Sequence, residues 1–193
     1  MSDFTMSECA INDTRRWLER AVIGLNLCPF AKAVHVKGQI HFAVSLADEP
    51  ADVLEALVVE LKALVALDAE VRDTTLLILV RGFDEFLDFN DFLARANVVL
   101  RKLSLQGIIQ IAPFHPQFQF ADAAQDDISN CTNRSPYPML HLLREVSVDR
   151  AVAAFPQADE IFEKNIHTLT KLGAPGWAAL DVGVHPEAGK MSA

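Results

Sequence analysis

The stretch Thr74–Val80, TTLLILV, decides the fold class of this chain. It is apolar without alternation, a pattern that is typical of a strand covered by other elements on both faces. Arg81 and Gly82 follow and end the apolar run. We therefore predict a buried strand over Thr75–Val80, with Thr74 at its start.

Helical and strand patterns lie on both sides of this strand. Upstream, alternation over Gln39–Leu46 predicts a half-exposed strand, and an apolar face over Pro50–Leu67 predicts a helix that Asp48 can cap. Downstream, we predict a helix over Asp88–Leu103 and a strand over Ile108–Ala112. Strands joined through helices are usually parallel, with right-handed crossovers. The direction of the first strand stays open.

Both flanking parts of the chain are predicted to be helical. Asn12 or Asp13 can cap a first helix, which is expected to stop before Pro29 because the residue preceding a proline avoids the helical region. A further helix is expected to begin near Pro136 or Pro138.

The last predicted helix covers Asp159–Leu172, and glycine and proline residues follow it. We expect one α/β domain over residues 1–173 and a loosely held tail over 174–193. The domain is predicted to hold a small, mainly parallel sheet of three or four strands flanked by helices. It also has a long functional loop after the third strand and a helical C-terminal part.

Composition limits the partners of the chain. The net charge of −9 disfavours nucleic acid and anionic membranes as partners. No apolar run reaches the roughly 18 residues that span a bilayer, and the first residues lack the basic start and apolar core of a signal peptide. The three cysteines are an odd number without a CxxC motif, which indicates free thiols and a reducing cytoplasm. The oligomeric state stays open.

The segment Pro113–Glu145 is the strongest candidate for a functional site. For about twenty residues it has no strand or helix period, and long structureless insertions in compact domains are usually functional or disordered. Its phenylalanines Phe114, Phe118 and Phe120 argue against disorder. We therefore expect an ordered loop that carries a site.

The predicted sheet gives this loop a position. Ligands of open α/β sheets bind outside the carboxyl ends of parallel strands, which here lie around Ser45, Arg81 and His115. Arg81 and Arg134 are predicted to bind an anion, because guanidinium groups pair with carboxylate or phosphate. Each of them also has a structural alternative, such as a surface ion pair.

Three residues are candidates for catalysis. His115 is the predicted proton carrier, Asp127 its orienting carboxylate and Cys131 a possible nucleophile. A buried, inert cysteine and a histidine that bonds a loop carbonyl are the structural alternatives. The residues predicted to bind the ligand all have polar side chains and lie in predicted loops. They are Arg81, Asn130, Asn133, Arg134, Ser135 and Tyr137.

Three functions remain open. The first is an enzyme that acts on a small anionic metabolite without a nucleotide cofactor, since no GxxxxGK[ST] motif is present. The second is a non-catalytic binding or regulatory module that uses the same pocket. The third is a metal-dependent hydrolase, although the spacing of His115, Cys131 and His141 matches no usual zinc pattern. We predict no metal site, and the sequence leaves other cofactors open.

Three stretches resemble a known family: RWLERAVIGLNLCPFA, FHPQFQFADAAQDDISNCTNRSPYPMLHLLRE and FPQADEIFEKNIHTLTKLG. The family they resemble is the uncharacterised bacterial domain-of-unknown-function family 1415, and the resemblance covers about Thr14–Gly173. It implies a stand-alone cytoplasmic bacterial protein. It brings no established reaction, cofactor or catalytic residue, so the choice of chemistry rests on the residues themselves.

Overall fold

A four-stranded sheet forms the centre of the structure, which is a computed structural model that describes residues 2–155 and 157–185. Its strands are β1 (Ile40–Ser45), β2 (Thr74–Leu79), β3 (Ile109–Phe114) and β4 (Met139–Arg144). They lie side by side in the order β1-β2-β4-β3. β1 runs parallel to β2, and β4 runs antiparallel to both β2 and β3. Consequently β1, β2 and β3 point in one direction, and the predicted α/β class is confirmed.

Strand β4 replaces a predicted helix. The helix expected to begin near Pro136 or Pro138 is wrong, because these residues lead into a strand in which Leu140 is paired with Leu77. A central strand is covered on both faces, so its apolar residues do not alternate and can be mistaken for a helical stripe. As a result, two of the three strand pairings are antiparallel, whereas the sequence predicts a mainly parallel sheet. Helix α5 (Glu145–Ala154) begins directly after β4.

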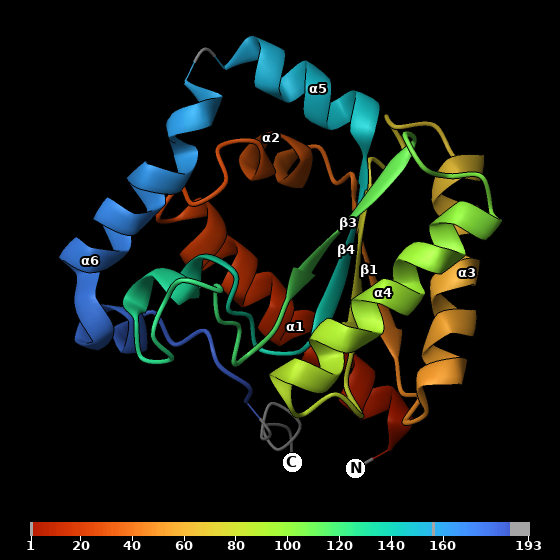
Figure 1. Cartoon of the computed structure of the whole chain (residues 1–193), viewed down its shortest axis with the longest axis horizontal. Coiled ribbons are helices and arrows are strands. Elements are labelled where there is room, and N and C mark those ends of the chain that lie inside the picture. Colours follow the sequence, from red (N-terminus) through yellow and green to blue (C-terminus); the bar gives the residue numbers. More distant parts are fainter. Residues whose placement is uncertain (1, 156, 186–193) are drawn as a thin grey trace, which may run out of the picture.

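Helices cover the two faces of the sheet (Figure 1). Helices α3 (Pro50–Ala66) and α4 (Phe86–Lys102) pack on one face around a core that includes Leu57 and Phe89, both fully buried. Helix α1 (Asp3–Trp17) and its π-helical continuation η1 (Leu18–Ile23) pack on the other face. The buried strand β2 lies between these two layers, as the sequence predicts.

Four further helical elements lie around the second face. They are α2 (Ala31–Val36), η2 (Ile128–Thr132), η3 (Ala158–Glu160) and α6 (Ile161–Ala179). Figure 1 shows α6 beside η2, which lies within the long loop. Helix α6 is interrupted at Gly173, whose φ of 67° is left-handed. The predicted helix end at this glycine is therefore a kink, and a short helical segment follows it.

Helix α1 begins earlier than predicted, and neither Asn12 nor Asp13 is its cap. Ser2 caps it by accepting a bond from the Thr5 amide. Asp13 is instead a buried residue within the helix. Its carboxylate accepts hydrogen bonds from tertiary partners, a use that short-range capping rules do not anticipate.

The chain after α6 returns to helix α1. Val182 is buried against this part of the core. Arg16 donates to the carbonyl oxygens of Asp181 and Gly183, at 2.9 Å each. The remaining part of the predicted tail, 186–193, lies outside the described residues.

Candidate functional site

Three loops meet at the carboxyl edge of the sheet, where β1, β2 and β3 end. The loop after β2 contains two successive left-handed residues, Gly82 (φ 68°) and Phe83 (φ 56°). A Cβ at Gly82 would lie 2.9 Å from the carbonyl oxygen of Asp48, so only glycine lets the loops after β1 and β2 touch. Left-handed backbone at a non-glycine residue costs energy and is concentrated at functional sites.

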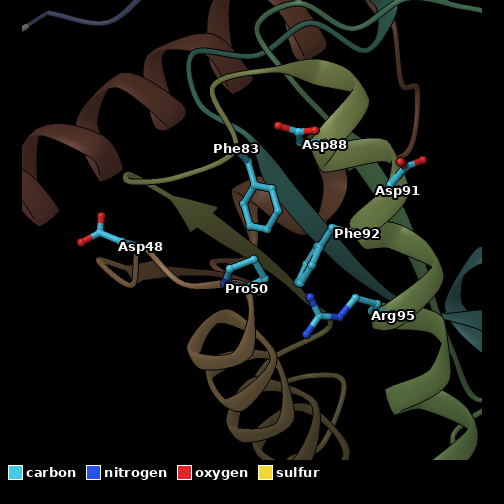
Figure 2. Close-up of a pocket in the computed structure, with 7 residues that line it drawn as sticks. All are labelled: Asp48, Pro50, Phe83, Asp88, Asp91, Phe92 and Arg95. Carbon is cyan, nitrogen blue, oxygen red and sulfur yellow. The ribbon is translucent and has the colours of Figure 1, made fainter.

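A first cleft of about 340 Å³ opens beside these two loops, between the N-terminal ends of α3 and α4. We call it the α3–α4 cleft. Figure 2 shows the rings of Phe83 and Phe92 facing each other at its centre, with acidic residues around them. The ring centroids are 4.5 Å apart. The residues that line the cleft are Asp48, Pro50, Phe83, Asp88, Asp91, Phe92 and Arg95.

A second cleft of about 460 Å³ lies within the long loop, residues 115–138. We call it the loop cleft. The residues that line it are Pro116 and four with polar or charged side chains, Gln117, Gln125, Asp126 and Arg134. Phe86 at the start of α4 packs against Phe118 of this loop, with ring centroids 5.1 Å apart. Both clefts therefore lie on the same edge of the sheet, as the strand-end argument predicts.

Hydrogen bonds to the main chain and from the side chain hold Arg134 in place. Its Nε donates to the carbonyl oxygen of Phe118 at 3.2 Å, and its Nη2 donates to that of Gln125 at 2.6 Å. The indole N–H of Trp17 donates to the Arg134 carbonyl oxygen at 2.9 Å. The guanidinium thus has a defined orientation in the cleft.

Asn130 and Asn133 hold the loop together from inside. Asn130 is fully buried, accepts from the Phe120 amide at 3.0 Å and donates to the Ala124 carbonyl at 2.8 Å. Asn133 donates from its side chain to the Pro113 carbonyl at 3.2 Å. Their amide groups are occupied by the loop's own backbone, which is the common use of asparagine in loops.

His115 is fully buried below the loop. Its Nε2 bonds the Phe83 carbonyl oxygen at 2.8 Å, and its Nδ1 accepts from the Gln117 amide at 3.0 Å. Burial lowers the pKa of this imidazole, and the bond to the Phe83 carbonyl opposes that shift. The neutral ring therefore links the long loop to the loop after β2, with both nitrogens bonded to backbone.

Asp127 and Cys131 lie in different environments from His115. The exposed Asp127 caps η2 by accepting from the Ser129 amide at 2.8 Å, and hydrogen bonds from Ser129 lower the pKa of its carboxyl. Cys131 is buried in an apolar cluster with Leu27 and Leu169. Burial raises the pKa of the Cys131 thiol, while the nearby Arg134 guanidinium opposes this. A thiol that stays protonated is a weak nucleophile.

Arg81 and the residues that follow Arg134 also make internal contacts. Arg81 forms an ion pair with Asp3 at 3.1 Å. The Ser135 hydroxyl donates to the Tyr137 carbonyl oxygen at 2.6 Å. The Tyr137 hydroxyl donates to the buried Asp13 carboxylate at 2.9 Å, and burial followed by this bond raises the pKa of the phenol.

Of the predicted site residues in the described part of the chain, only Arg134 lines either cleft. The sequence reasoning missed the α3–α4 cleft altogether. A signal was present, because Asp88, Asp91, Phe92 and Arg95 recur at the spacing of one helix face. Their position just after the end of a buried strand adds to that signal.

The described residues offer neither a metal-binding cluster nor a membrane-spanning helix. Among the described residues, no group of three or more His, Cys, Asp or Glu side chains is arranged to hold a metal ion. His141, a candidate zinc ligand, instead bonds the Thr74 hydroxyl at 2.7 Å, and burial lowers its pKa to about 4. No helix in residues 2–155 and 157–185 is long and apolar enough to cross a bilayer.

Comparison with known proteins gives one match. No curated protein and no solved structure matches the chain. A family model described as "Protein of unknown function (DUF1415)" matches residues 9–179. This span includes the sheet, both clefts and the whole long loop. The chain therefore belongs to the DUF1415 family.

Proposed function

We propose that the protein binds a small molecule carrying a carboxylate or phosphate group at Arg134, without catalysing a reaction on it. The observation that carries the proposal is the state of the Arg134 guanidinium. Two carbonyl bonds fix its plane, while Nη1 donates to none of the described residues. An oriented guanidinium with unused donors is suited to a two-bond contact with a carboxylate or phosphate.

The other residues of the loop cleft narrow the ligand further. Asp126 adds a carboxylate, and Gln117 and Gln125 add amides. A purely anionic ligand would be repelled by Asp126, whereas ammonium or hydroxyl groups can donate to it. The ligand therefore combines an acidic group with hydrogen-bond donors. A cleft of about 460 Å³ is within the usual range for small-molecule sites.

The rest of the loop supports binding by holding the cleft in shape before a ligand arrives. Trp17 fixes the main chain of Arg134, and Asn130 fixes the turn that carries Gln125 and Asp126. Ordering a loop during association weakens affinity. A cleft whose walls are already bonded to the protein avoids most of that cost.

The enzyme alternative has less support. It requires His115, Asp127 and Cys131 to act on one ligand, and none of them lines the loop cleft in the described structure. Both nitrogens of His115 bond backbone groups, and burial raises the pKa of the Cys131 thiol. A base or nucleophile needs an accessible atom. The geometry therefore favours the binding module.

The cellular setting is part of the same proposal. The three cysteines are free, and both Cys9 and Cys131 are buried. Free thiols fit a reducing cytoplasm. The net charge of −9 disfavours nucleic acid and anionic membranes as partners. We therefore place a small cytoplasmic metabolite, rather than a polyanion, at the loop cleft.

A thermal-shift screen tests the proposal. Wild-type protein is screened against phosphate, amino acids and hydroxy acids, and the best ligand is titrated by calorimetry. Arg134→Gln is expected to weaken binding about tenfold or more, since a charge-assisted bond contributes about 1.5–3 kcal/mol. Arg150→Gln on α5, an exposed residue, is the matched control and keeps wild-type affinity.

Arg134→Gln could weaken binding by disturbing the loop, so Asp126→Asn is a second test. The exposed Asp126 side chain makes no hydrogen bond to a described residue, and its replacement should leave the fold unchanged. It is expected to change the preference between ligands with and without an ammonium group while the melting temperature stays constant. Binding that is equal in wild type, Arg134→Gln and Asp126→Asn would place the site elsewhere. Measured turnover of the bound ligand would favour the enzyme alternative.

A further inference from the structure

The α3–α4 cleft has a composition that the loop cleft does not share. Three carboxylates, Asp48, Asp88 and Asp91, surround it, and Arg95 is its single cationic side chain. We infer that this cleft binds a linear aliphatic polyamine, with its methylene chain on the Phe83–Phe92 floor and its ammonium groups at the acidic rim. This site is independent of the proposed ligand of Arg134.

Two aromatic rings form the floor of the cleft, and the guanidinium of Arg95 lies over one of them. Phe92 is almost fully buried and Phe83 is half-buried against it, with ring centroids 4.5 Å apart. The guanidinium of Arg95 lies over the Phe92 ring at 6.0 Å from its centroid. Aromatic faces attract cations and also cover methylene groups. Arg95 therefore occupies the place that we assign to part of the ligand.

The charged residues of the cleft are not used elsewhere in the described structure. Asp48, Asp91 and Arg95 make no ion pair or side-chain hydrogen bond with a described residue. Asp88 lies in the first turn of α4, where a negative charge is favourable to the helix dipole and needs no ligand. The same explanation applies to Asp48, which directly precedes the N-cap of α3, but it does not extend to Asp91, which lies beyond the first turn of α4.

The spacing of the carboxylates favours several separated charges over one ion. Figure 2 shows Asp48 on one side of the aromatic pair and Asp88 and Asp91 on the other. Among the described residues, they do not form a group that could close around a metal ion. Ammonium groups joined by methylene chains match both the separated carboxylates and the apolar floor. The net charge of −9 adds long-range attraction for such a cation.

Isothermal titration calorimetry with spermidine tests the inference on the full chain. Asp91→Asn is expected to weaken binding about fivefold, since one rim charge contributes about 1 kcal/mol in solvent. Arg95→Gln is expected to tighten binding by a similar factor, because it removes the internal cation that competes for Phe92. The two variants therefore have opposite effects, which a shared loss of folding cannot produce.

Matched controls separate this cleft from general attraction to an acidic protein. Asp149→Asn on α5 and Arg101→Gln on α4 alter exposed charges outside the cleft and should leave spermidine affinity within twofold of wild type. Equal weakening by Asp149→Asn and Asp91→Asn would overturn the inference. So would the absence of spermidine binding to wild type at millimolar concentration, or unchanged spermidine binding in Arg95→Gln.

Discussion

The inner and outer parts of the long loop use similar polar residues for different purposes. The inner part contains His115, Asn130 and Asn133, whose side chains bond the protein's own backbone. The outer part contains Gln125 and Arg134, which line the loop cleft. His115 and Asn130 are fully buried, Asn133 and Arg134 are half-buried, and Gln125 is exposed. Arg134 also donates to two backbone carbonyl oxygens, but unlike the inner residues it lines the cleft.

The difference teaches what a polar loop in an apolar protein needs. A loop without strand or helix bonds must satisfy its buried backbone groups by other means. Asparagine and histidine supply these bonds from within. A loop with many polar residues can therefore be one that bonds its own backbone. Only the polar side chains that make no such bond are fully available to a ligand. Mutations can break or sharpen this distinction.

Asn130→Ala is expected to have the largest effect. It removes the acceptor for the Phe120 amide and the donor to the Ala124 and Gln125 carbonyls, all within the loop. Because buried groups are left unpaired, we expect the free energy of unfolding to fall by about 3 kcal/mol. Urea denaturation measures this. A loss below about 1 kcal/mol would mean that the inner amide does not hold the loop.

His115 gives the next largest effect, through pH. Burial lowers its pKa in the folded state, so below about pH 6.5 the unfolded chain binds the proton more readily. Stability is therefore retained above that pH and lost as the pH falls. The contribution of one histidine is at most about 1.4 kcal/mol per pH unit.

The variant His115→Gln separates this contribution from that of other groups. Its amide can still donate to the Phe83 carbonyl, but it does not titrate. His141, whose pKa burial lowers to about 4, adds the same sign of pH dependence in both proteins. Urea midpoints between pH 7 and 5 should therefore fall less steeply in the variant. Equal slopes would show that His115 is not a buried neutral group.

Much of the fold follows from the sequence because its signals are local. The apolar run Thr74–Val80 predicts the buried strand β2, and the apolar faces of α3 and α4 predict the helices beside it. Strand β4 could not be identified in this way. Its position between β2 and β3 depends on pairing over long sequence separations, such as Thr74 with Leu143. Local periodicity carries no information about such pairing.

The sequence predicts a site at the edge of the sheet where both clefts lie, but of the residues it proposes only Arg134 lines a cleft in the described part of the chain. The strand-end rule needs only the direction of β1, β2 and β3, so it holds even though β4 lies among them. Which loop side chains turn inward depends on the folded loop. The sequence supports His115 and Arg134 equally as site residues. In the structure His115 is fully buried and bonds only backbone groups, whereas the half-buried Arg134 lines the loop cleft with an oriented guanidinium.

Gln125→Ala is expected to have the smallest effect on stability and completes the comparison with Asn130→Ala. Both changes remove a side-chain amide from the same loop, but the Gln125 side chain is exposed, and only its main-chain carbonyl bonds Arg134. The variant keeps that carbonyl, so its free energy of unfolding should stay within about 0.5 kcal/mol of wild type. Affinity for the ligand of the loop cleft should nevertheless fall, since the lost amide lines the cleft. A stability loss as large as that of Asn130→Ala would contradict the distinction between the inner and outer parts of the loop. Weaker ligand binding at constant stability would instead show that the outer amide serves the ligand and not the fold.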